Sequence, residues 1–307
     1  MTQTTNTAAL QDDARAWGDF WANSARSGGG GCLPERWAAI ESAQQEAWAD
    51  FVADLPQGAR VLDLATGDGA VLRWMRAARA DLSLTGIDLA PTLPTPPVGT
   101  EIRGGIAMEH LPFGDGGFDA VVSQFGFEYG DVRAIAAEIG RVLAPQGRVG
   151  LIVHRGDGPI LEHNRSRQRE LLWALRDKST AKKAKALLAR GPKAIPKALK
   201  LAEEVAKMGA EKFGQTSPAW EVPEAIRRSV MMGARVGPAS IIETIETIET
   251  QAKNELGRIA SLARACGTAD DRDALHAAFA DVSRTHQSTQ AIYEPSGRAL
   301  ADFLTFS

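Results

Sequence analysis

The order of hydrophobic and polar residues in the middle of the chain predicts alternating strands and helices. Short apolar runs rich in β-branched residues and bounded by turn residues predict buried strands, whereas apolar residues spaced three and four apart predict helices. The expected strands cover residues 60–65, 82–90, 101–107, 118–126 and 147–155, and the expected helices between them include 71–80 and 132–143. Strands that alternate with helices indicate a parallel sheet covered by helices on both faces.

The segments on either side of this region have a helical pattern. Residues 11–24 place Trp17, Phe20 and Trp21 on one helical face, and a second helix is expected over 34–55. The segment 159–265 is rich in Ala, Lys, Glu and Leu and predicts four or five helices.

The last segment has two apolar runs separated by a Pro-Ser-Gly turn, which predicts a terminal hairpin that rejoins the sheet. We therefore expect four parts. These are N-terminal helices over 1–56, an alternating core over 57–158, a helical lobe over 159–285 and a terminal hairpin over 286–307.

Composition narrows the class of protein. Hydrophobic residues make up 44% of the 307 positions and charged residues 24%, which is typical of a soluble globular protein. Cys32 and Cys266 fit neither a disulfide framework nor a zinc spacing, and the five histidines form no metal-binding pair, so no metal is expected. The chain begins without a signal-peptide pattern and has no long apolar run, so we expect a cytoplasmic protein.

The charge distribution is uneven. The net charge of −3 gives no general reason to expect a nucleic-acid partner. Residues 155–212, however, carry 15 Lys and Arg against 7 Asp and Glu. This excess is explained either by solvated helix faces or by an acidic partner or substrate. RNA is disfavoured, because aromatic residues are only 6% of the chain and do not alternate with Lys and Arg.

A glycine-rich loop follows the first strand of the alternating region, in the stretch VLDLATGDGAVL (residues 61–72). Dinucleotide-binding loops have the spacing G-x-G-x-x-G, but counting from Gly67 places Leu72 where the third glycine would stand. No Gly-Lys-Ser/Thr follows either, which excludes a P-loop. The loop therefore belongs to neither of these nucleotide-binding types.

The pattern D-x-[GA]-x-G-x-G at 63–69 instead resembles motif I of the class I S-adenosylmethionine-dependent methyltransferases. Three further stretches resemble that family in the same order: TGIDLA at 85–90, EHLPFGDGGFDAVVSQFGFEY at 109–129 and RVLAPQGRVGLIVH at 141–154. The style of the motifs is most similar to the type 11 or ubiquinone/menaquinone methyltransferase branch. The resemblance implies a doubly wound α/β fold with a mostly parallel, seven-stranded Rossmann-like sheet, an N-terminal helical lid and a large helical C-terminal insertion.

The resemblance also implies a cofactor, S-adenosyl-L-methionine, with S-adenosyl-L-homocysteine as product. The residues that would bind it lie in the loop and at the ends of later strands. Asp63 would meet the ammonium group of the cofactor and Asp88 would bind the ribose hydroxyls, because a carboxylate accepts two donors at once. The others are Ala65, Gly67 and Gly69 at the methionine and ribose, Leu89, Ala107 and Met108 at the adenine, and Ser123 and Gln124 at the sulfonium.

Two positions depart from the family pattern. Members often have Asp where Ala107 stands, so the adenine amino group would need a backbone carbonyl, a water or Glu109 as acceptor; the lost hydrogen bond costs about 1 kcal/mol. Phe127–Tyr129 replaces a Glu-His pair that many relatives have, so a histidine base is not expected from that position.

Three residues near the ends of the fourth and fifth strands are the candidates for acceptor chemistry. Glu128 and Tyr129 would line the acceptor site, or else Glu128 caps the next helix and Tyr129 merely packs. His154 is placed to act as a general base, or else it is a structural histidine. The N-terminal aromatic residues would form either a lid over the cofactor or an ordinary core-facing helix.

These features predict an S-adenosylmethionine-dependent methyltransferase that acts on a small molecule, with oxygen or carbon as the preferred acceptor atom. The helical lobe would select the acceptor, and its basic excess would suit an acidic one. Two alternatives stay open at this point: a non-methylating, cyclase-like enzyme that binds the same cofactor, and a protein or RNA methyltransferase. The sequence does not indicate an oligomeric state.

Overall fold

The computed structural model describes residue 18 and residues 38–307, which fold as two compact units. The sheet unit comprises the described residues up to Leu161 together with Ser261–Ser307, and the helical unit comprises Glu162–Ala260. The aromatic residues of the predicted lid, Trp17, Phe20 and Trp21, lie outside the described residues.

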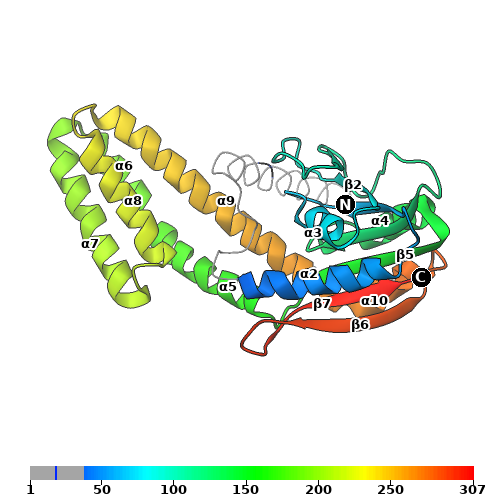
Figure 1. The fold of residues 1–307 in the computed structure, drawn as a ribbon. Helices are drawn as coiled ribbons and strands as arrows, with labels where there is room; N and C mark the ends of the chain where they lie inside the picture. Colours follow the sequence, from blue (N-terminus) through cyan, green and yellow to red (C-terminus); the bar gives the residue numbers. More distant parts are fainter. Residues whose placement is uncertain (1–17, 19–37) are drawn as a thin grey trace, which may run out of the picture. The chain divides into compact units, whose positions relative to one another are not determined.

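The sheet unit is built on a seven-stranded sheet with the order β3-β2-β1-β4-β5-β7-β6 (Figure 1). The first five strands pair in parallel, whereas β7 runs antiparallel to both β5 and β6, so the sheet is mixed. The strand order reverses between β1 and β4, which is where open sheets of this kind bind ligands. The strands are β1 Arg60–Leu64, β2 Ser83–Ile87, β3 Thr100–Arg103, β4 Phe118–Gln124, β5 Leu143–His154, β6 His286–Tyr293 and β7 Ala299–Phe306.

Helices cover both faces of the sheet, as the near-continuous apolar character of β1 and β4 requires. On one face α2 (Ala38–Ala53) and α3 (Ala70–Ala78) bury Trp48, Phe51, Leu72 and Met75 against the strands. On the other face α4 (Val132–Val142) and α10 (Arg272–Ala280) bury Ile135, Ile139, Leu275 and Phe279.

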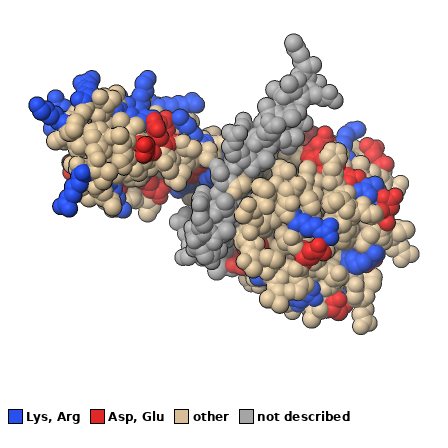
Figure 2. All heavy atoms as spheres, turned by 90° about the horizontal axis from the view of Figure 1, so that it is seen from above, with Lys and Arg blue, Asp and Glu red and all other residues tan. Residues whose placement is uncertain are grey.

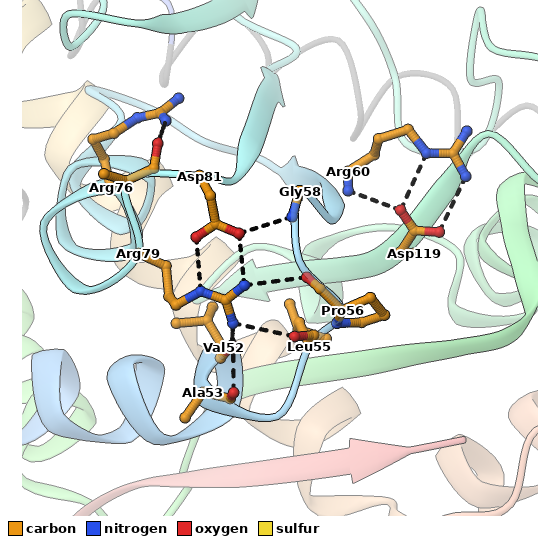
Figure 3. Close-up of polar contacts among 11 residues, drawn as sticks. Val52, Ala53, Leu55, Pro56, Gly58, Arg60, Arg76, Arg79, Asp81 and Asp119 are labelled. Atoms are coloured by element: carbon orange, nitrogen blue, oxygen red, sulfur yellow. Dashed lines mark hydrogen bonds and ion pairs between the residues drawn. The ribbon is translucent and has the colours of Figure 1, made fainter.

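Arg79 fixes the end of α2 to the end of α3 (Figure 3). Its guanidinium donates to the main-chain carbonyls of Val52, Leu55 and Pro56 at 3.0, 3.1 and 3.2 Å. The last carbonyls of a helix lack partners within the helix, so a cation placed there satisfies them and opposes the helix dipole. Asp81 accepts from the same guanidinium at 2.7 Å and from the Gly58 amide at 2.7 Å, which secures the turn that leads into β1.

The helical unit has its own apolar core, formed by one side of each helix. Helices α7 and α8 run antiparallel, and they approach closely because Gly209 has no side chain where it meets the Ala219 carbonyl (Figure 1). The helices here are α5 Pro159–Leu172, α6 Thr180–Leu188, α7 Ile195–Phe213, α8 Pro218–Gly233 and α9 Pro238–Asp270.

The predicted extent of the helical lobe, 159–285, is wrong at its C-terminal side. The compact helical unit ends at Ala260, and the residues that follow belong to the sheet unit. The physical reason is that Ala269, Leu275 and Phe279 are fully or almost fully buried in the core beneath β4 and β5. A helical pattern shows that a face is apolar but not which core that face joins.

Gly150 on β5 provides a test of how closely α2 packs on the sheet. A Cβ at this position would lie 3.0 Å from Phe51 Cε2 and 3.1 Å from Trp48 Cζ3. We expect Gly150→Val to lower the free energy of unfolding by about 1–3 kcal/mol, because it overpacks this contact. Gly114→Val is the control, since a Cβ there meets nothing within 4 Å, and it should change stability by about 0.5 kcal/mol or less. Equal midpoints of denaturant unfolding for the two variants would contradict this packing.

Candidate functional site

The glycine loop joins β1 to α3 at the carboxyl edge of the sheet, beside the reversal of strand order. Three alternate residues of the loop have left-handed backbone angles: Ala65 (φ 56°), Gly67 (φ 55°) and Gly69 (φ 73°). Glycine adopts this conformation without penalty, whereas an alanine there costs about 1–2 kcal/mol. Ala65 also restricts its neighbour, because a Cβ at Gly126 would overlap with the Ala65 methyl group.

Asp88, directly after β2, holds the loop in place. Its carboxylate accepts from the Gly67 amide at 2.9 Å through Oδ2 and from the Ala90 amide at 2.9 Å through Oδ1. Burial raises the pKa of this carboxyl, and the two amides oppose the rise. The carboxylate thus connects the end of β2 to the middle of the glycine loop and still has lone pairs for further donors.

Asp63, on β1, is a buried carboxylate that is only half satisfied. Its side chain is almost fully buried, and Oδ2 accepts from the Thr66 hydroxyl at 2.6 Å. Oδ1 has no hydrogen-bond partner among the described residues. Burial, together with the nearby Asp88 and Asp68, raises the pKa of Asp63 to about 7. A buried acceptor in this state favours a ligand that brings a positive charge or a hydrogen-bond donor.

The residues expected at the adenine adjoin Asp88. Leu89 is 41% exposed, which is unusual for a large apolar side chain, and Ile106 donates its amide to the Asp88 carbonyl at 2.9 Å. Ala107 and Met108, which follow Ile106, are therefore held near the end of β2. Glu109, considered as a replacement acceptor for the adenine, instead accepts from the Asp131 amide at 3.0 Å through Oε1.

Ser123 and Gln124, at the end of β4, bond within the protein. The Ser123 hydroxyl donates to the Leu64 carbonyl at 2.9 Å and accepts from the Phe127 amide at 3.0 Å. Gln124 accepts from Trp48 Nε1 at 2.7 Å and donates to Gln44 Oε1 at 3.3 Å. Both residues thus fix the frame of the site, Ser123 by joining β4 to β1 and Gln124 by joining β4 to α2.

Glu128, Tyr129 and His154 come together where β4 and β5 end. Glu128 Oε1 lies 2.7 Å from His154 Nδ1 and also accepts from the His154 amide at 2.9 Å. The Tyr129 ring meets the His154 ring edge-on at 5.9 Å, and the Phe125 ring lies 4.3 Å from it on another side. The Glu128 side chain is fully buried, and its second oxygen has no partner among the described residues.

The alternative role for Glu128, as a helix cap, is wrong. The short 3-10 helix η2 (Phe127–Tyr129) carries Glu128, and α4 begins after it with Asp131 as the N-cap. Asp131 Oδ1 accepts from the amides of Arg133 and Ala134, both at 3.1 Å. The cap is therefore already provided, and the carboxylate of Glu128 is directed to His154 instead.

Two polar residues of the site were not anticipated from the sequence. Thr66 holds Asp63 through its hydroxyl, and its place inside the D-x-A-x-G-x-G pattern was the available signal. Gln44 on α2 is almost fully buried, and its Nε2 has no partner among the described residues. Nothing in the helical pattern of 34–55 distinguished Gln44 from a solvent-facing glutamine.

Residues 38–307 contain no group of three or more His, Cys, Asp or Glu arranged to hold a metal ion. Among the described helices, none combines the length and the apolar character needed to cross a bilayer.

Comparison with known proteins shows that the region around the glycine loop is similar to methyltransferases. Residues 62–151 match the model of a methyltransferase domain. Demethylmenaquinone methyltransferase of Thermus thermophilus is 37% identical over 101 residues, which cover 29% of this chain and 44% of that protein. The enzyme of the same name from Thermotoga maritima is 34% identical over 98 residues, which cover 30% and 42%. The chain thus spans less than half the length of these relatives.

Among solved structures, 1,6-didemethyltoxoflavin-N1-methyltransferase of Burkholderia thailandensis aligns with 96% of this chain and 88% of its own, at 14% identity and a TM-score of 0.46. The matched region 62–151 contains the glycine loop, Asp88 and Glu128. Over residues 62–151 the chain is therefore similar to a methyltransferase domain.

Proposed function

We propose that the protein transfers a methyl group from S-adenosyl-L-methionine to an oxygen or carbon atom of a small molecule. The observation that carries the proposal is the buried Glu128–His154 pair at the carboxyl ends of β4 and β5, which lie beside the glycine loop in the sheet order. A histidine oriented by a carboxylate is the arrangement that removes a proton from an attacking group.

The residues of the loop fit the cofactor. Its ammonium group would meet the free oxygen of Asp63, which is buried without a partner. Its ribose hydroxyls would donate to Asp88, whose carboxylate accepts backbone amides and keeps lone pairs for further donors. Its adenine would cover Leu89, which is otherwise exposed to water.

S-Adenosylmethionine, when bound, supplies a methyl group on a positively charged sulfur. His154 would prepare the acceptor for it. An ionised Glu128 only accepts hydrogen bonds, so the 2.7 Å contact places the ring proton on Nδ1 and leaves Nε2 with a lone pair. Nε2 can then take the proton of a hydroxyl or enol, and Glu128 stabilises the imidazolium that forms. The flanking rings of Tyr129 and Phe125 hold the imidazole plane.

The acceptor is a small molecule with an acidic O–H or an enolisable carbon. Removal of a proton is needed for such groups before they attack, and the Glu128–His154 pair provides it. The names of the relatives from Thermus thermophilus and Thermotoga maritima, which specify demethylmenaquinone, support an acceptor of this chemical kind.

Asp88 should control cofactor affinity. Asp88→Ala removes a charged acceptor for the ribose and releases the Gly67 amide, and we expect affinity for S-adenosylhomocysteine to fall by about 10- to 100-fold in calorimetric titration. Asp119→Ala is the control, because Asp119 pairs with Arg60 at the opposite ends of β4 and β1 (Figure 3). It should leave affinity unchanged, and a similar loss in both variants would contradict the proposed ribose contact.

Asp63 should make cofactor binding dependent on pH. A bound ammonium favours the ionised carboxylate, so affinity should rise as Asp63 ionises, by up to about tenfold per pH unit below its pKa of about 7, and level off above it. The same raised pKa means that the unliganded fold binds a proton that the unfolded chain has lost, so unliganded stability should fall as pH rises from about 4 to about 7. Asp63→Asn should abolish the rise in affinity between pH 6 and 8, and an unchanged slope in this variant would exclude Asp63 as its source.

His154 and Glu128 should affect turnover rather than cofactor binding. We expect His154→Gln to lower kcat by about 10²- to 10⁴-fold, and Glu128→Gln to lower it less and to change the pH profile of kcat. The assay follows a labelled methyl group into the small-molecule and polymer fractions of a cell extract. Label in protein or RNA would refute the small-molecule acceptor. Cofactor binding without any transfer would favour a non-methylating enzyme, and wild-type turnover in His154→Gln would refute the role of this base.

A further inference from the structure

We propose that one end of the helical unit binds the surface of an anionic lipid bilayer. The surface in question, called the basic tip here, consists of four cations and three apolar residues at the α6–α7 and α8–α9 connections. They are Arg190, Lys193, Lys197, Arg235, Met231, Met232 and Val236. The proposal is independent of the transfer reaction.

The two connections lie at the same end of the helical unit. Helices α7 and α8 are antiparallel neighbours, and Gly209 of α7 abuts the carbonyl of Ala219 of α8. From this contact, α7 extends 14 residues back to Ile195 and α8 extends 14 residues forward to Gly233. At about 1.5 Å per residue the two ends are level, which brings the segment before α7 beside the segment after α8 (Figure 1).

The apolar residues of the basic tip are unusually exposed. Met232 and Val236 are 76% and 75% exposed and Met231 is 52% exposed, whereas Ile226 and Val230 of the same helix are fully buried. The core of the helical unit is therefore complete without the three exposed side chains. Large apolar side chains gathered at one place on a surface indicate an interaction site.

The cations of the basic tip differ from several cations on the sides of the helices, which are paired. Lys185, Lys200 and Lys207 each pair with a glutamate, at 3.0, 3.8 and 3.9 Å. None of the four cations of the basic tip forms an ion pair with any residue among 38–307, although all four are exposed. Glu243 is the only acidic residue between 189 and 197 or between 231 and 243.

The charge of the whole helical unit points to the same ligand. Residues 162–260 carry 19 Lys and Arg against 12 Asp and Glu, a net charge of +7 in a chain whose total is −3. In Figure 2 Lys and Arg outnumber Asp and Glu on the visible face of this unit. An anionic surface therefore attracts the helical unit and repels the remainder of the chain, which favours approach through the helical unit.

The combination of unpaired cations with aliphatic side chains selects a lipid surface over nucleic acid. Lys and Arg bind headgroup phosphates, while Met and Val enter the boundary between headgroups and acyl chains. Single-stranded nucleic acid is bound by stacking on aromatic side chains, and the exposed residues of the basic tip include none. Contact is peripheral, since the described helices include none able to span the bilayer.

The test is flotation of the full-length protein with phosphatidylcholine vesicles, made with and without phosphatidylglycerol. We expect binding only with phosphatidylglycerol, and weakening by salt. Lys193→Gln combined with Arg235→Gln should reduce binding by about fivefold for each cation. Met232→Ser combined with Val236→Ser should reduce vesicle binding severalfold while leaving retention on heparin, a lipid-free polyanion, unchanged.

The matched control is Lys200→Gln combined with Lys207→Gln, which removes the same charge from the side of α7. It should reduce binding less than the pair at the basic tip. The exposed positions of all these residues predict unchanged thermal midpoints, which are measured alongside. Absent binding, equal binding to neutral vesicles or equal losses in both charge pairs would overturn the proposal. An unaltered vesicle affinity in Met232→Ser/Val236→Ser would also overturn it, because simple charge attraction would then suffice.

Discussion

Burial of carboxylates at the carboxyl edge of the sheet is the constraint on which the candidate site depends. Asp63, Asp88 and Glu128 are each withdrawn from water at the ends of β1, β2 and β4, where an unpaired charge is costly. Asp88 is satisfied by backbone amides of the loop that it holds. Folding thus lowers the cost at Asp88, whereas Asp63 and Glu128 each keep one oxygen without a partner among the described residues.

The boundaries of the two central strands β1 and β4 follow closely from the sequence, because a strand buried on both faces must be almost entirely apolar, whereas β3 ends and β5 begins about four residues earlier than expected. Residues 60–65 and 118–126 were expected as strands, and β1 and β4 cover Arg60–Leu64 and Phe118–Gln124. The mixed character of the sheet arises from β7, which pairs antiparallel with β5 as well as with its hairpin partner β6. The extent of the helical lobe was harder to predict. Leu275 and Phe279 have the same spacing in the sequence whether they pack in the core of the helical unit or in the core of the sheet unit.

The features of the site that the sequence did not predict are hydrogen bonds between residues that lie on different elements. The glycine spacing and Asp88 are local patterns, and they predicted the position of the loop correctly. The contact of Glu128 with His154 joins residues 26 positions apart on different elements, and only the pairing of β4 with β5 brings them together. Ser123 is a second case. It was expected beside the sulfonium of the cofactor, and its hydroxyl donates to the Leu64 carbonyl and accepts from the Phe127 amide, two contacts that its sequence position did not predict.

Ala65 shows how one substitution in a motif is accommodated by a residue far away in the sequence. Its left-handed backbone would suit glycine, and its methyl group occupies space that a side chain at position 126 would need. Gly126 lies between Phe125, which is itself left-handed at φ 56°, and the short helix that carries Glu128. The alanine in the glycine loop and the turn before Glu128 are therefore sterically coupled. A side chain at position 126 would overlap with the Ala65 methyl group, so the close approach of the glycine loop and this turn depends on the absence of one side chain.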